Sequence, residues 1–244
     1  MSWVVENLSL IVSLAGLHLR QSLISIVIGF ALSLPLGWLA WRFGLVRGPL
    51  LLVTGVLYTI PSIALLPMLP AVFGFPIFSD VNLIVALTIY AVALLTRTVA
   101  DGLDSVDPAV RLSATALGYG PFRRFFAVEL PLAGPVVLAG LRVAAVSTIS
   151  LATVGILVGV QNLGYLFTNG FQRRIVEEIL AGVAAVVVIA LLVDLLVVLA
   201  GRLLMPWTRA GRVRRVAAGG PGAPSAPAAP ADAPASAPNQ GVVA

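Results

Sequence analysis

Few side chains in this 244-residue chain could do covalent chemistry. There is one histidine, His18, and there is no cysteine and no lysine. An intramembrane enzyme needs a nucleophile with a base, or a metal held by several ligands, and one isolated histidine supplies neither. A Gly-rich phosphate-binding loop also needs a lysine. The sequence therefore predicts no catalytic residue, no metal site and no cofactor, and ATP hydrolysis would have to occur on another chain.

Three charged side chains lie inside apolar stretches long enough to cross a membrane. Arg142 and Asp194 lie about 13 Å from the ends of their stretches on the same side of the membrane. Because an isolated charge in a bilayer is costly, we expect these two to face inward and pair. Two alternatives compete: Arg142 could bond to carbonyls of the second span or reach Glu129, and Asp194 could pair across a dimer interface. Arg97 is followed four residues later by Asp101, which favours an interfacial ion pair.

A polar island interrupts the apolar sequence at residues 107–131, which read DPAVRLSATALGYGPFRRFFAVELP. Asp107 is a good N-cap, and Pro108 suits the first position of a helix. This pattern predicts a short helix from Pro108 to about Leu117 that stops at Gly118. A membrane protein has little reason to keep such a stretch unless it meets a partner in water.

Pro121 opens a second short helix in the polar island, and Pro131 is expected to end it. The residues between them predict one aromatic face and one basic face, because their spacing follows the helical period. The aromatic face would hold Phe122, Phe125 and Phe126, and the basic face Arg123 and Arg124.

The composition is that of an integral membrane protein. Hydrophobic residues make up 59% of the chain, charged residues 10%, and the mean hydropathy is +1.06, which is far from the average soluble domain. The sequence predicts an all-α membrane protein with about five transmembrane helices and a cytoplasmic loop. The predicted spans lie at about 17–41, 50–73, 81–100, 132–159 and 179–203.

The regions outside these spans have their own predictions. Residues 1–16 lack the features of a secretory signal peptide and are interpreted as an interfacial lead-in to a transmembrane domain at 17–206. Residues 160–178 could be a plain outer loop or a short re-entrant element. The Pro/Ala/Gly-rich residues 217–244 have too little large apolar surface to fold, so this tail is predicted to be disordered.

The second span carries several prolines, which free backbone carbonyls that lipid cannot satisfy. It is therefore expected to be broken, to face protein and to line a pathway. Candidate pathway residues are Pro61, Tyr90 and Tyr165, although interface or packing roles explain the two tyrosines better.

Arginines in the loops predict the orientation of the chain. Only Arg20, Arg173 and Arg174 fall on one side of the predicted spans, while most of the others fall on the opposite side. The arginine-rich side is cytoplasmic by the positive-inside rule. The N-terminus is therefore expected outside, the C-terminus in the cytoplasm, and the polar island on the cytoplasmic side. The formal charge of +5 is explained by this orientation and not by nucleic acid binding.

The polar island resembles the coupling loop of permeases from ATP-binding-cassette importers. That motif reads Glu-Ala-Ala, three residues, Gly, nine residues, Ile, one residue, Leu-Pro. Here its positions are occupied by Ser113, Ala114, Gly118, Leu130 and Pro131. The first position departs from the motif, because Leu112 stands where the family usually has Glu. The resemblance implies that these residues, together with Pro121, Phe122 and Arg123, couple the permease to an ATPase.

Further stretches resemble permeases for glycine betaine, carnitine and choline over roughly residues 18–206. They are Thr59-Ile60-Pro61-Ser62, Ala64-Leu65-Leu66, Asp107-Pro108, Ala139-Gly140-Leu141-Arg142, Leu163-Gly164-Tyr165 and Asn169-Gly170. The resemblance implies a transport subunit of the bacterial cell membrane, working by alternating access and surrounded by lipid. Its expected partners are cytoplasmic ATP-binding subunits, an external substrate-binding protein and a second permease, identical or homologous.

Two other readings of the function stay open at this point. An importer permease for another small solute, of the amino acid type, would share the coupling loop. A secondary transporter would show inverted repeats or paired discontinuous helices, and the sequence shows no convincing self-similarity. Co-purification of an ATPase would separate the importer from the secondary transporter.

Overall fold

The computed structural model describes residues 2–74 and 76–207, and every regular element in this part of the chain is helical. The chain divides into two units, residues 1–205 and 206–244, and the fold described below is that of the first. The predicted tail at 217–244 and the last four arginines lie outside the described residues. The elements are α1 (Ser2–Glu6), α2 (Leu8–Arg42), α3 (Gly44–Thr59), α4 (Ser62–Phe73), α5 (Asp80–Asp104), α6 (Pro108–Ala116), α7 (Pro121–Arg124), the π-helical turn η1 (Phe125–Glu129), α8 (Leu130–Ala152), the 3-10 turn η2 (Thr153–Val158), α9 (Gly164–Arg173) and α10 (Val176–Leu204).

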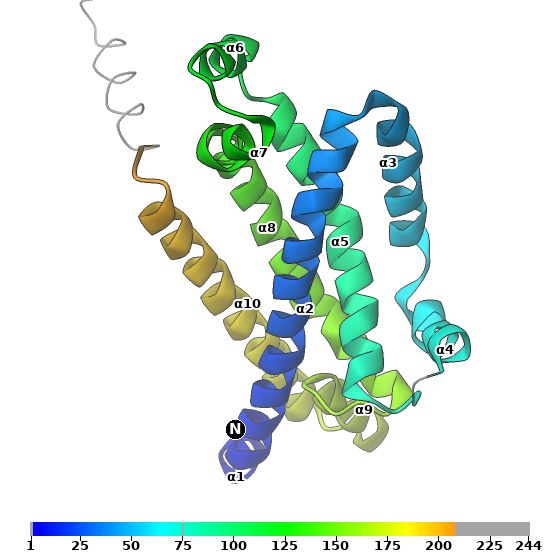
Figure 1. Cartoon of the computed structure of the whole chain (residues 1–244). Coiled ribbons are helices and arrows are strands. Elements are labelled where there is room, and N and C mark those ends of the chain that lie inside the picture. The colour runs from blue at the N-terminus through cyan, green and yellow to red at the C-terminus, as the bar shows by residue number, and fades with distance from the viewer. Residues whose placement is uncertain (1, 75, 208–244) are drawn as a thin grey trace, which may run out of the picture. The chain divides into compact units, whose positions relative to one another are not determined.

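Four helical segments are each long and apolar enough to cross a membrane: α2, α5, the run from α7 through η2, and α10. A fifth span is possible if α3 and α4 are counted together, since they form a pair bent by 110°. This agrees with the predicted all-α fold of about five spans. Figure 1 shows α2, α5 and α8 as neighbouring helices, with α6 and α7 at the end opposite α1 and α9.

The helix that contains the first predicted span is longer than that span. Helix α2 is a single helix of 35 residues from Leu8, so it is about 50 Å long and extends beyond the predicted span at 17–41 toward the N-terminus. Two polar side chains inside this helix, His18 and Gln21, are buried. His18 Nε2 lies 3.0 Å from the carbonyl oxygen of Ile149, and Gln21 Nε2 donates to Asp80 at 3.0 Å. Tertiary partners thus let polar residues continue the helix. The placement of residues 1–16 at the interface stays a prediction.

The second span is broken, as predicted. Ile60 and Pro61 have extended backbone angles between α3 and α4. Proline has no N–H to donate, so the helix cannot pass through it without losing a backbone hydrogen bond. The hydroxyl of Tyr90 on α5 donates to the carbonyl of Ile60, which satisfies an acceptor that the break sets free.

Small residues allow the central helices to pack closely. A Cβ added to Gly29 of α2 would lie 2.5 Å from the Cβ of Ala91 on α5, and one added to Gly37 would lie 2.5 Å from the Cβ of Val99. Real Cβ atoms do not approach so closely. Glycines on α2 therefore bring its backbone against α5, in the way that small residues promote helix association in membranes.

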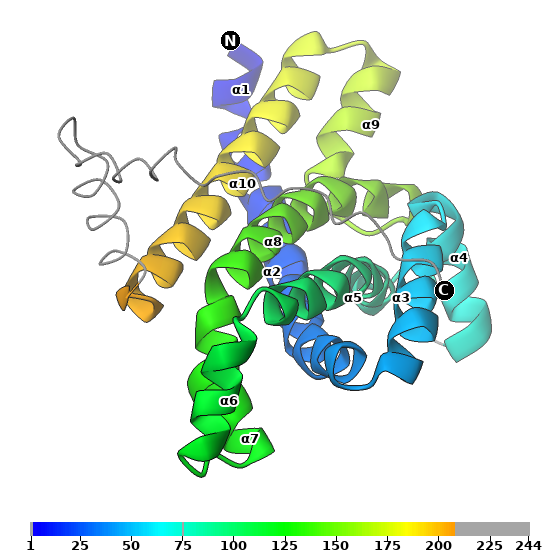
Figure 2. The same ribbon diagram turned by 90° about the horizontal axis from the view of Figure 1, so that it is seen from above.

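The segment at 160–178 is folded and not a plain loop. Asn162 organises its start, because its Nδ2 donates to the carbonyl of Ala152 at 2.8 Å and its Oδ1 accepts from the N–H of Gly164 at 2.8 Å. Helix α9 follows and packs beside α10 (Figure 2). At its far end, Asn169 donates to the buried carboxylate of Glu178 at 2.7 Å.

Candidate functional site

Helix α6 forms where the sequence predicts it. The Asp107 side chain accepts from the N–H of Ala109 at 2.8 Å, Pro108 lies in the first turn, and Gly118 adopts a left-handed φ of +82° after the helix ends. A glycine is suited to that φ because a Cβ would strain it. Helix α6 is therefore a locally encoded unit with its own cap and its own stop.

The motif residues of α6 divide between two surfaces. Leu112 is 72% exposed and Ser113 is exposed, whereas Ala114 is only 6% exposed. The structure thus presents Leu112, which replaces the usual glutamate, to the surroundings and turns the small Ala114 inward. An apolar contact is what Leu112 can offer in place of the acid.

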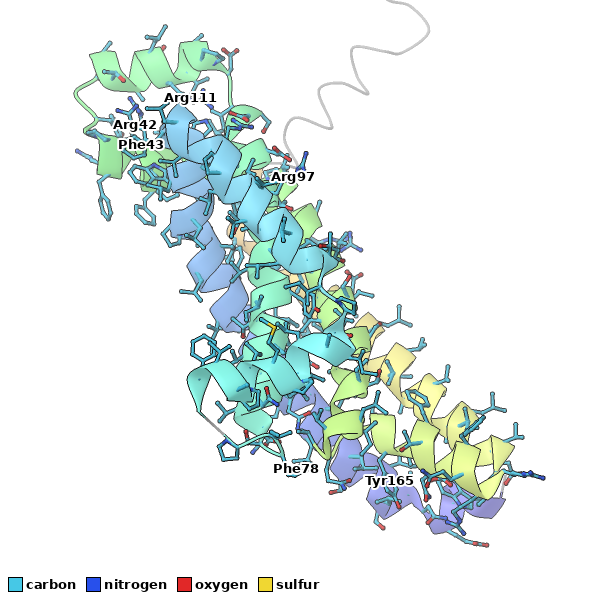
Figure 3. All side chains as sticks on the ribbon, turned by 90° about the vertical axis from the view of Figure 1, so that its right-hand side faces the viewer. Arg42, Phe43, Phe78, Arg97, Arg111 and Tyr165 are labelled. Carbon is cyan, nitrogen blue, oxygen red and sulfur yellow. The ribbon has the colours of Figure 1, made fainter. Side chains whose placement is uncertain are left out.

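Arg111 anchors α6 to the rest of the bundle. Its guanidinium carbon lies 4.8 Å from the ring centre of Trp41 at the end of α2, and its Nη2 donates to the carbonyl of Leu103. Figure 3 shows Arg111 near Arg42 and Phe43 at this end of the bundle. Sequence reasoning gave Arg111 no role beyond orientation, because the contact joins elements far apart in the chain.

The predicted aromatic face of the second short helix of the polar island is divided in the structure. Phe122 and Phe126 are 78% and 51% exposed, with ring centres 4.8 Å apart, whereas Phe125 is buried and packs edge-on against Trp38. Only two of the three phenylalanines therefore form an exposed aromatic patch. Arg123 stacks over the ring of Tyr119, with 4.7 Å from its guanidinium carbon to the ring centre.

The prediction that Pro131 ends this helix is wrong. The chain continues without a break from Pro121 of α7 through the π turn η1 into α8, where Pro131 lies in the first turn. In an α-helix the proline ring collides with the carbonyl four residues earlier. Here the N–H of Leu130 bonds instead to the carbonyl of Phe125, five residues back, and this wider turn accommodates the proline. Residues 121–129 and the fourth span are thus one uninterrupted helical run.

A buried ion pair locks the π turn, and sequence reasoning missed it. Arg124 Nε donates to Glu129 Oε1 at 2.7 Å, and the side chains are 18% and 1% exposed. Arg124 Nη1 also donates to the hydroxyl of Thr115 on α6 at 2.9 Å. One guanidinium therefore ties α6 to the start of α8. The signal in the sequence was Glu129, an acid directly before Leu130-Pro131. Its partner Arg124 lies five residues earlier, and a regular α-helix does not bring side chains at that spacing together.

The predicted pairing of Arg142 with Asp194 is present. Nε and Nη2 of Arg142 donate to the two carboxylate oxygens of Asp194 at 2.7 and 2.8 Å. The alternative partner Glu129 is engaged by Arg124 instead. The pair is not enclosed within the chain: the two side chains are 45% and 24% exposed and line an open groove of about 760 Å³ between α8 and α10.

Arg97 lies apart from that pair, on an exposed face of α5. It contacts Asp101 only loosely, with 3.9 Å between nitrogen and oxygen, and its side chain is 74% exposed. The same Asp101 also lies 3.8 Å from Arg47, which pairs more closely with Asp104 at 2.6 Å. The interfacial ion pair expected from the sequence is therefore part of a small cluster at one end of α5.

The three pathway candidates do not meet in one place. Pro61 and Tyr90 lie together at the break between α3 and α4, and Tyr90 is 5% exposed and edge-on to Tyr58, with 6.0 Å between ring centres. Tyr165 packs instead against an apolar cluster formed by other helices, and Figure 3 shows it at the end of the bundle far from Arg111. Both tyrosines therefore pack within the fold.

Comparison with known proteins identifies the family. Residues 25–210 match the family described as binding-protein-dependent transport system inner membrane component. The choline transport system permease protein OpuBB of Bacillus subtilis (strain 168) is 30% identical over 78% of this chain and 86% of its own. The glycine betaine/carnitine/choline transport system permease protein OpuCD of the same organism is 32% identical over 78% and 82%. The osmoprotectant import permease protein OsmW of Salmonella typhimurium (strain LT2) is 28% identical over 79% and 90%.

Solved structures agree on the fold. A chain of the MetNI methionine ABC transporter in an inward-facing conformation matches with a TM-score of 0.72 and 19% identity, over 82% of this chain and 98% of that chain. A chain of an amino acid ABC transporter crystallised with histidines matches with a TM-score of 0.62 and 18% identity, over 83% and 96%. The chain belongs to the family of inner membrane components of binding-protein-dependent transport systems and has the fold of an ABC importer permease.

Proposed function

We propose that this chain is the permease subunit of an ATP-driven importer of osmoprotectants, of the class of glycine betaine, carnitine and choline. Relatives at 30% and 32% identity carry those substrates in their names. The permease does no covalent chemistry and holds no ATPase site of its own. It moves substrate by opening alternately to the two sides of the membrane.

The observation that carries this proposal is the continuous path from the exposed coupling helices into the fourth span. Phe122 is 78% exposed, and the chain runs from it without interruption into α8. An exposed aromatic side chain beside a basic one suits helix-in-groove docking on a protein partner. A force on α7 would reach α8 through the π turn, since the helical run has no break between them.

The exposed surface of α6 and α7 also suggests the orientation of the chain and its partners. The α6–α7 end would face the cytoplasm and dock an ATP-binding subunit, and the α1–α9 end, where the chain begins, would face the external binding protein. A second permease, identical or homologous, would complete the pathway, with lipid around both.

Co-purification and uptake test the proposal. The chain, expressed with the ATPase and binding protein of the same importer, should purify in complex with the ATPase. Proteoliposomes of this complex should take up labelled glycine betaine or choline only with internal ATP and external binding protein. Uptake without ATP would favour a secondary transporter, and uptake of amino acids alone would assign another solute class.

A further inference from the structure

The groove between α8 and α10 contains charges at a depth where lipid would not tolerate them. Arg142 and Asp194 lie well inside their helices and are 45% and 24% exposed, and two serines, Ser147 and Ser150, share the lining. Exposure of such groups to hydrocarbon is costly. This face of α8 and α10 therefore meets water or protein and not acyl chains.

The rest of the groove is apolar and roomy. Its walls include Val143, Val146, Val187 and Leu191, and Figure 2 shows α8 and α10 side by side. A volume of about 760 Å³ lies within the range of small-molecule sites, which combine apolar walls with a few polar groups. The groove thus offers one cation, one anion and apolar walls to a small solute.

We propose that this groove is a substrate site of the permease, and that it takes a zwitterion with a carboxylate and a methylated ammonium. This inference rests on the proposed function and adds the place and the chemistry of binding. The carboxylate of the solute bonds to Arg142, its ammonium lies against Asp194, and its methyl groups pack on the valines and Leu191.

Charge compensation is the physical reason for this assignment. When the solute is absent, Arg142 and Asp194 compensate each other through two hydrogen bonds. A zwitterion that separates them gives each charge a new partner, so neither is left alone at membrane depth. A cation without a carboxylate would satisfy Asp194 and leave Arg142 unpaired. The groove is therefore expected to prefer glycine betaine over choline.

Weak binding is expected, and it suits transport. The described lining of the groove contains no aromatic side chain, so it offers no cation–π cage of the kind that holds quaternary amines tightly. A pathway site has to release its solute as readily as it accepts it.

The absence of cysteine from the chain allows a direct test in the complete transporter, with its ATPase subunits and without binding protein. Ser147→Cys is treated with a charged thiol reagent while glycine betaine or choline is added in increasing concentration. We expect labelling of this cysteine and protection by glycine betaine at a concentration about tenfold or more below that of choline. Ser150→Cys is the second position in case Ser147→Cys does not assemble. Ser9→Cys, on an exposed position of α2, should be labelled without protection.

Arg142→Gln in the cysteine variant is the decisive change. The half-protecting concentration of glycine betaine should rise about tenfold or more, the size expected for a lost charged hydrogen bond, and that of choline should change less than about twofold. Arg47→Gln breaks another interhelical Arg–Asp pair, with Asp104, and should alter neither value.

Three results would overturn the site. The first is no labelling of the cysteine at either position, which would mean that a second permease or lipid fills the groove, and the second is labelling without protection by solute. The third is an equal shift of the half-protecting concentrations of both solutes in Arg142→Gln, which would mean that the ion pair only stabilises the fold. Uptake driven by the binding protein is measured on the same preparation. If the transporter takes up these solutes but fails the labelling test, the proposed function stands and the proposed site is wrong. If it takes up neither glycine betaine nor choline, the proposed function and the proposed site are both wrong.

Discussion

The carboxylate of Glu129, directly before the first residue of α8, accepts a 2.7 Å hydrogen bond from the guanidinium of Arg124. Both side chains are largely buried, although they lie at the junction between α8 and the helices α6 and α7. Arg124 also donates to Thr115 on α6, so this ion pair connects α6 to the start of α8. It is therefore one of the contacts through which a force on α6 would reach α8 in the proposed coupling path.

Glu129→Ala should destabilise this junction. Removal of one partner of a buried ion pair leaves the other charge uncompensated, which costs about 3 kcal/mol at the low end of the usual range; the low end applies because Arg124 keeps 18% of its side chain exposed. We expect a lower unfolding temperature of the purified permease and a loss of uptake.

The double variant Arg124→Met with Glu129→Leu separates stability from coupling. It removes both charges, so the unfolding temperature should return toward that of the wild type, while uptake should stay low because the link to Thr115 is gone. Full recovery of uptake in the double variant would show that the ion pair only stabilises the fold.

Phe122→Asp should separate ATP hydrolysis from transport. The charged side chain cannot enter an apolar groove on an ATPase, so we expect insertion into the membrane to be normal and uptake per ATP hydrolysed to fall strongly. The measurement is ATPase activity and solute uptake on the same proteoliposomes. Phe171→Asp is a matched control for co-purification of the ATPase, because Phe171 is also 78% exposed but lies on α9 at the other end of the bundle. Normal coupling in Phe122→Asp would remove the docking surface from α7.

The parts of the fold that the sequence predicts are those with local signals. Asp107 and Gly118 set the ends of α6 through capping and φ preference, and Pro61 breaks the second span through its missing N–H. Each effect acts within a few residues. The pairing of Arg142 with Asp194 was also predictable, because counting residues from the ends of the two spans places both charges at the same depth in the membrane.

The remaining features depend on contacts that no local pattern reports. His18 and Gln21 are polar residues inside the first span, and α8 and α5 supply their hydrogen-bond partners. Likewise, Pro131 does not end its helix, since the π turn changes the spacing around it. Arg124 was assigned to an exposed basic face for the same reason: regular helical spacing does not bring it to Glu129.

Tyr90→Phe should weaken the break between α3 and α4. It removes the hydroxyl that donates to the carbonyl of Ile60 and leaves that acceptor without this donor, which costs about 1 kcal/mol. We expect a small but measurable fall in the unfolding temperature. Tyr58→Phe is the control, because Tyr58 is 47% exposed and belongs to the same aromatic pair. Equal effects of the two substitutions would contradict a special role of the Tyr90 hydroxyl.

A double-mutant cycle on Arg142 and Asp194 tests whether their pairing also stabilises the permease. Arg142→Met leaves the carboxylate of Asp194 without its two hydrogen bonds at membrane depth, so the unfolding temperature should fall. Adding Asp194→Leu removes the remaining charge and should recover part of that loss, since an uncompensated charge costs more there than an apolar pair. Effects of neighbouring residues that interact are not additive. Strictly additive losses would therefore mean that the two side chains contribute independently, and that the ion pair between α8 and α10 does not hold these helices together.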